Sequence, residues 1–144
     1  MPTLNQGPKM QNTTNQHEAT QESRLDRGKR ILFEIDGAAG EKVISALADI
    51  APDFAQYLFE FPFGDIYSRP GLDVRSREVA TIAALTAMGN ARPQLKVHIA
   101  AGLNVGLSRD EIVETIMQMA VYAGFPAALN GLFAAKEVFQ GHAP

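Results

Sequence analysis

His98 is the residue of this sequence best suited to acid–base chemistry. It lies in the stretch NARPQLKVHIAAGLNVG, whose apolar spacing predicts a helix over residues 92–106. The other two histidines, His17 and His142, lie near the ends of the chain. Gln94 stands four residues before His98 and therefore shares its helix face. Because histidine gains and loses a proton near neutral pH, this face predicts a site of proton transfer.

Glu78 is the second candidate for this chemistry. It stands in the first turn of the helix predicted by DVRSREVATIAALTAMGN, where the helix dipole favours a carboxylate. A tight turn at Gly89-Asn90 joins this helix to that of His98, so the two helices should pack antiparallel and bring Glu78 to His98. Each residue also has a structural interpretation. His98 fits a core histidine bonded to a backbone carbonyl, and Glu78 fits a helix-start carboxylate or a surface ion pair with Arg75 or Lys96.

Arginines and a tyrosine supply the candidate substrate-binding groups. Four arginines flank two predicted turns; such residues are commonly solvated, but they can also hold a carboxylate. They are Arg69, Arg75, Arg77 and Arg92. Arg77 is the best candidate for a carboxylate clamp, and Gln94 and Tyr122 complete the predicted binding set. Tyr122 precedes a Gly-Phe-Pro turn, a position that favours a core side chain over a catalytic one.

Helical periodicity extends over the chain from Arg24 onward and positions these residues. Leu25, Ile31, Leu32 and Ile35 share a face of the first helix, which Gly37 should stop. A short helix over 41–50 and an aromatic segment over 51–67 follow, with Pro62 expected to break or kink the latter. Ser108 and Glu111 form a capping box before a helix whose later part is apolar nearly all round, which predicts burial on more than one side. One more helix follows the turn at residues 124–126. No strand-like alternation occurs, so the sequence predicts an all-α, compact helical bundle, and its many small residues favour a homo-oligomer.

Composition excludes several classes of function. The chain has 144 residues, a length typical of one domain, and a net charge of −3, so it has no basic field for nucleic acid. It has no cysteine, which excludes disulfides, thiolate metal sites and thiol redox chemistry. No phosphate loop, nucleophile elbow or metal-ligand spacing is present, so we expect neither a cofactor nor a metal. No segment reaches the roughly 20 apolar residues of a membrane span. Residues 1–23 are polar and predict a flexible N-terminal arm, which leaves 24–144 as the helical domain of a cytoplasmic protein.

Three stretches of the sequence resemble the carboxymuconolactone decarboxylase family. They are GDIYSRPGL, QLKVHIAAGLNVGLSRDEI and QMAVYAGFPAALN. The resemblance covers nearly all of the chain after the arm. It implies an all-α fold built round a helical hairpin, and a ring-shaped homo-oligomer, commonly a trimer or hexamer, with active sites near subunit interfaces.

The resemblance also distinguishes between two branches of this superfamily. Alkyl hydroperoxidase D-like members use a Glu, a Cys-x-x-Cys pair and a His as a proton relay. Glu78 and His98 match two of these positions, but Ala91 and Gln94 stand at the cysteine positions. Because both thiols are absent, thiol peroxidase activity is excluded. The cofactor-free decarboxylase branch remains.

The decarboxylase branch implies a reaction in the catabolism of aromatic compounds. It converts γ-carboxymuconolactone, also called 4-carboxymuconolactone, to the enol-lactone with loss of carbon dioxide. The resemblance assigns proton donation to His98 and its orientation to Glu78. That branch tends to carry an acidic residue at the position of Gln94 and a small polar one at that of Glu78. Lactone hydrolysis, isomerisation and a non-catalytic ligand-binding oligomer therefore stay open as alternatives.

Overall fold

The computed structural model describes residues 21–142, and these are all-helical. Seven α-helices and one π-helix follow one another along this part of the chain, which contains no strand. They are α1 (Arg24–Asp36), α2 (Ala38–Ser45), α3 (Pro52–Leu58), η1 (Phe59–Tyr67), α4 (Val74–Met88), α5 (Arg92–Asn104), α6 (Arg109–Ala123) and α7 (Phe125–Gly141). The helical fold is therefore as predicted. The predicted arm lies outside the described residues except for its last three.

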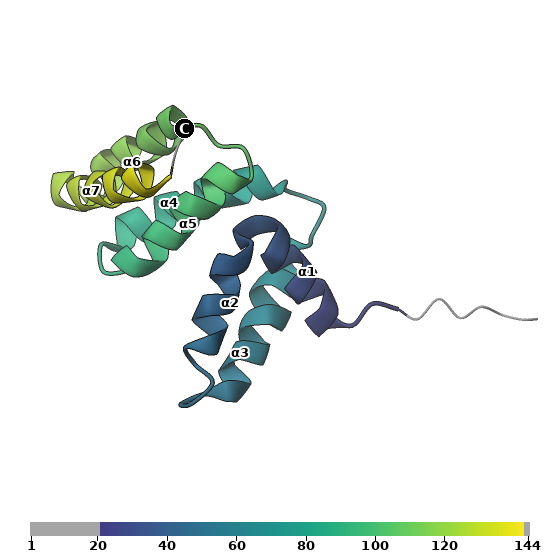
Figure 1. The fold of residues 1–144 in the computed structure, drawn as a ribbon. Coiled ribbons are helices and arrows are strands. Elements are labelled where there is room, and N and C mark those ends of the chain that lie inside the picture. Colours follow the sequence, from purple (N-terminus) through teal and green to yellow (C-terminus); the bar gives the residue numbers. More distant parts are fainter. Residues whose placement is uncertain (1–20, 143–144) are drawn as a thin grey trace, which may run out of the picture.

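The helices form two groups that meet at α5 (Figure 1). The helices α4 to α7 enclose one apolar core, in which Ile82, Ile99, Ile112 and Ile116 are completely buried. The helices α1 and η1 enclose a second core with one residue of α5, Ala101. Since Ile99 and Ala101 belong to different cores, α5 is shared by both groups. A residue of α5 between the two cores is thus held from both sides.

The predicted helix signals account for most of the helix ends. Ser23 caps α1 by accepting a hydrogen bond from the Asp26 amide, and Gly37 ends this helix with a φ of 55°. Both halves of the capping box at Ser108 and Glu111 are formed. The second helix differs from the prediction: α2 begins at Ala38, directly after Gly37, and ends at Ser45 rather than at residue 50.

Pro62 does not break the chain into separate helices. Instead α3 ends at Leu58, and the chain continues as the π-helix η1 with Pro62 inside it. Proline has no amide proton and its ring clashes with the preceding turn of an α-helix, and the wider π-turn relieves that clash. The predicted break at Pro62 is therefore not found: the change of helix type lies between Leu58 and Phe59, before Pro62.

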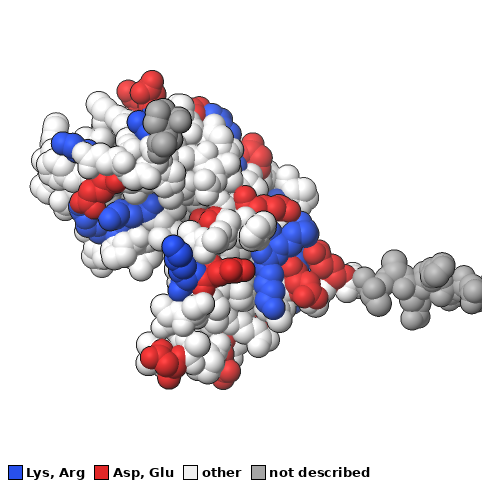
Figure 2. Space-filling view, viewed as in Figure 1, with Lys and Arg blue, Asp and Glu red and all other residues white. Residues whose placement is uncertain are grey.

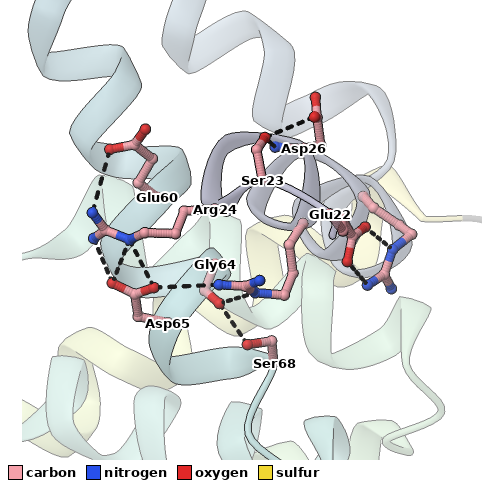
Figure 3. A network of polar contacts seen from close by, with 10 residues as sticks. Glu22, Ser23, Arg24, Asp26, Glu60, Gly64, Asp65 and Ser68 are labelled. Atoms are coloured by element: carbon pink, nitrogen blue, oxygen red, sulfur yellow. Dashed lines mark hydrogen bonds and ion pairs between the residues drawn. The ribbon is translucent and has the colours of Figure 1, made fainter. Parts of the chain in front are cut away.

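A close approach and a polar network hold α1 against η1. Gly28 permits the approach: a Cβ atom there would lie 2.0 Å from the carbonyl oxygen of Phe59. Beside it, the Arg24 guanidinium binds the Asp65 carboxylate, and Arg27 donates to the backbone carbonyl of Gly64 over 2.6 Å (Figure 3). These contacts hold the N-terminal half of α1 against η1.

One side of α6 and α7 is apolar and uncovered in the single chain. Its exposed apolar side chains are Met117, Val121, Tyr122, Phe125, Leu129 and Phe133, and we call this set the α6–α7 apolar face. The prediction that α6 is buried on more than one side is therefore wrong for one chain, which buries Ile112 and Ile116 only along one side. Exposed apolar side chains gathered on two adjacent helices typically mark a contact with another molecule.

Charged side chains of both signs are interspersed on the face of the molecule shown in Figure 2. Several are paired, as in the contacts of Glu137 with Arg92 and Lys96. Within residues 21–142 no helix has the length and apolar character that crossing a membrane requires.

Candidate active site

His98 and Glu78 form a hydrogen-bonded pair between α5 and α4. The Nδ1 atom of His98 lies 2.9 Å from Oε2 of Glu78. The Glu78 side chain is completely buried, and that of His98 is 20% exposed. The contact predicted from the tight turn between the two helices is confirmed. The surface ion pairs considered for Glu78 are not formed, because Arg75 binds Glu111 and Lys96 binds Glu137.

The two helices hold this pair because their ends are well defined. Asp73 caps α4 by accepting from the Ser76 amide over 2.6 Å, so Glu78 stands in the second turn and not, as predicted, in the first. Gly89 ends α4 in the left-handed conformation, with a φ of 74°, and Pro93 stands in the first turn of α5. The short connection makes the helices antiparallel neighbours and brings Glu78 beneath His98.

Glu78 has one hydrogen-bond partner in the described part of the chain. Its Oε1 atom is buried without a partner there, so the carboxylate depends on His98. When this carboxylate is ionised, Nδ1 of His98 donates its proton to it, which fixes the tautomer and the plane of the ring. The Nε2 atom is then the ring nitrogen available to a bound molecule.

His98 lines a cavity of about 470 Å³ between the two helix groups. Its walls are mainly apolar and come from α1, α2, α3, η1, α4 and α5. The apolar lining residues are Leu32, Val43, Leu58, Pro62, Phe63, Pro93 and Val97. The polar lining residues are Asp36, Tyr67, Thr81, Gln94 and His98. A mainly apolar cavity of this size with a few convergent polar groups is typical of a site for a small molecule.

Arg77 and Tyr122 do not line this cavity, contrary to the prediction. Arg77 donates to the backbone carbonyls of Leu72 and Arg69, over 3.2 and 3.1 Å, and its guanidinium lies over the Tyr67 ring. It therefore secures the turn before α4. Tyr122 belongs to the α6–α7 apolar face and is 77% exposed, so its expected core position is also wrong. Gln94 does line the cavity with His98, as predicted.

Sequence reasoning missed Asp36, Tyr67 and Thr81. Asp36 ends α1 and is 8% exposed, and burial raises the pKa of its carboxyl group from 3.8 to about 6. Burial also raises the pKa of Tyr67 to about 12, and the Tyr67 hydroxyl bonds Thr81 over 2.7 Å. Two spacings in the sequence could have indicated that Asp36 and Thr81 belong to the site. Asp36 follows the buried Leu32 by four residues, and Thr81 follows Glu78 by three, so each pair shares a helix face.

This arrangement is suited to moving a proton in a water-poor environment. A histidine with a fixed tautomer, a buried carboxylate behind it and an apolar cavity in front are the parts of a general acid–base site. The lining contains no lysine or arginine from the described residues, so His98 is the lining residue that can become positively charged. In this same part of the chain, no group of three or more His, Cys, Asp or Glu side chains is arranged to hold a metal ion.

Comparison with known proteins places this geometry in context. The sequence model of the carboxymuconolactone decarboxylase family matches residues 52–137, which include Glu78, Gln94 and His98. A 4-carboxymuconolactone decarboxylase of Acinetobacter baylyi is 36% identical over 123 residues, which cover 83% of this chain and 89% of that protein. An uncharacterized 15.0 kDa protein of Paracoccus denitrificans is 32% identical over 80% of this chain and 87% of its own length. A nitrosuccinic acid decarboxylase of Metarhizium robertsii is 26% identical over 81% of each chain.

Proposed function

The chain belongs to the carboxymuconolactone decarboxylase family and is a carboxy-lyase, and we propose that it decarboxylates 4-carboxymuconolactone or a related lactone acid without a cofactor. The observation that supports this most directly is the His98–Glu78 pair at an apolar cavity. The reaction would belong to the breakdown of aromatic compounds.

The proposed reaction separates a carboxylate from the lactone ring. The bond between the ring carbon and the carboxylate breaks, and its electron pair moves through the conjugated double bond toward the lactone carbonyl oxygen. Carbon dioxide leaves, and a proton must then reach a ring carbon. The apolar walls favour this step, because a localised carboxylate charge is solvated poorly there, whereas carbon dioxide is neutral and the remaining charge is dispersed.

His98 supplies the proton in this proposal. In its protonated form it attracts the substrate carboxylate, and after carbon dioxide has left, Nε2 transfers its proton to the ring carbon. Glu78 keeps Nδ1 hydrogen-bonded throughout, so the ring does not rotate away and its positive charge is stabilised. Water then restores the proton to His98.

We further propose that the protein is a homo-oligomer, a trimer or a hexamer. The α6–α7 apolar face supports this, because side chains such as Val121 and Phe125 are more than 70% exposed in one chain. Covering such a face with the same face or another surface of a second copy removes apolar area from water.

Turnover of 4-carboxymuconolactone tests the proposed reaction. Carbon dioxide release and loss of the lactone are measured together for the wild type, for His98→Ala and for His142→Ala. We expect equal rates of both signals in the wild type and a loss of about a hundredfold or more in His98→Ala. His142 lies at the end of α7 outside the cavity, so its variant serves as the matched control and should keep full activity.

Two results would contradict the proposal. Loss of the lactone without carbon dioxide would show hydrolysis or isomerisation instead. Full activity in His98→Ala, with the control also active, would remove His98 from the mechanism.

A further inference from the structure

Asp36 is a buried acidic group of the cavity that the proposed mechanism does not use. It stands at the C-terminal end of α1, is 8% exposed, and lines the same cavity as His98. Its carboxyl group makes no hydrogen bond to another described residue. A helix C-terminus is also an unfavourable place for a negative charge.

The surroundings of Asp36 favour its acid form. Burial is the main cause that raises its pKa, to about 6; the charge of His98 lowers it, and that of Glu78 raises it. The charges of His98, from α5, and Glu78, from α4, act on Asp36, and Tyr67 of η1 lines the same cavity. The helix α2 adds only Gly40 and Val43 to the cavity lining. Asp36 can therefore carry a proton at a pH at which exposed aspartates are ionised.

The other buried hydrogen-bond donors that line the cavity already have acceptors or a role in the proposed reaction. Thr81 donates to the backbone carbonyl of Arg77 over 2.9 Å, so in the contact with Tyr67 the tyrosine is the donor. The Nδ1 proton of His98 is directed to Glu78, and its Nε2 proton is the one that the reaction consumes. Gln94 is exposed at the rim. Asp36 in its acid form is the buried donor that remains.

We propose that Asp36, as a neutral carboxylic acid, donates a hydrogen bond to the lactone carbonyl oxygen that receives the electron pair as carbon dioxide leaves. This inference rests on the proposed function and assigns a role that the family match does not cover, because Asp36 lies before residue 52. Asp36 keeps its proton throughout, and the proton that reaches carbon comes from His98. A donor at a developing oxyanion stabilises the transition state more than the ground state, so Asp36 should affect kcat more than KM.

Two substitutions separate this role from a structural one. Asp36→Asn keeps a hydrogen-bond donor but cannot ionise, whereas Asp36→Ala removes the donor. With 4-carboxymuconolactone, we expect Asp36→Ala to lower kcat by about a hundredfold with little change in KM. In the wild type, kcat should fall as the pH rises through about 6, because ionised Asp36 cannot donate. Asp36→Asn should retain much of kcat and show a smaller fall than the wild type, because Asp36 no longer contributes to the dependence on pH.

The inference is wrong if Asp36→Ala keeps the wild-type kcat, or if kcat of Asp36→Asn depends on pH as steeply as that of the wild type. Circular dichroism of each variant confirms that it is folded. If the wild type does not turn over 4-carboxymuconolactone, the proposed substrate fails, and binding of butenolide, an unsaturated lactone without a carboxylate, tests Asp36 separately. Its affinity for the wild type should be higher at pH 5 than at pH 8 and should depend less on pH in Asp36→Asn. An equal pH dependence in the two proteins would overturn the role of Asp36.

Discussion

Replacing Asp36 by asparagine should raise the free energy of unfolding more at pH 8 than at pH 4. The ordinary pKa of this carboxyl group is 3.8, and burial raises it to about 6 in the folded chain. Between these values the unfolded chain has already lost the proton while the folded chain still holds it. The free energy of unfolding of the wild type therefore falls as the pH rises from about 4 to 6, and it stays lower above pH 6.

The size of this effect follows from the shift in pKa. A shift of about two pH units corresponds to about 3 kcal/mol, at 1.36 kcal/mol per unit. Because the cavity opens to water, which screens part of the charge, we expect about 2 kcal/mol. Asparagine removes the ionisation, so its benefit is absent at pH 4 and fully present at pH 8.

Urea unfolding at pH 4 and pH 8 measures this difference. The change in the unfolding free energy caused by Asp36→Asn is determined at each pH, and the two changes are subtracted, which cancels any effect of the amide that does not depend on pH. Asp49→Asn is the matched control, because Asp49 is exposed in the turn after α2. The reasoning is refuted if the difference between the two pH values is below about 0.5 kcal/mol, or if it equals that of the control.

Two further predictions concern packing. Gly28→Ala should destabilise the chain by more than about 2 kcal/mol, because its Cβ would meet the carbonyl oxygen of Phe59 and the backbones of α1 and η1 would have to separate. Thermal unfolding measures this loss. Gly71→Ala is the control and should change the stability little, because its Cβ would meet open space. Val121→Glu should lower the mass measured by light scattering toward that of a single chain, because it places a charge on the α6–α7 apolar face. Asn90→Glu, in the turn after α4, is the control and should leave the mass unchanged. An unchanged mass for both variants would show that this face is not the contact between copies.

The parts of the site that local sequence rules determine were predictable. The capping box at Ser108 and the turn at Gly89 are set by neighbouring residues, and the Glu78–His98 contact follows from that turn and the helical period. Asp36 could not be found in this way. It lines the same cavity as His98 only because α1 packs against α5, and this packing depends on contacts between residues far apart in the sequence.

The positions of Arg77 and Tyr122 outside the cavity have physical causes as well. Arg77 adjoins Glu78 in sequence, but consecutive residues of a helix point about 100° apart, so its guanidinium reaches the carbonyls before α4 instead of the cavity. Tyr122 lies in an apolar run, and hydrophobicity alone does not distinguish the core of one chain from a surface that another molecule covers.

The position of the cavity between the two helix groups places the proton-transfer pair and most of the cavity wall on different helices. The acid–base pair stands on α4 and α5, whereas much of the wall comes from α1, α2, α3 and η1, and the first two of these precede the family match. Mutations in these N-terminal helices can therefore reshape the cavity while the proton-transfer pair stays in place. Such a division gives evolution a route to new substrates from one reaction, and it makes the wall positions Leu32 and Val43 the natural starting points for a library that alters substrate choice.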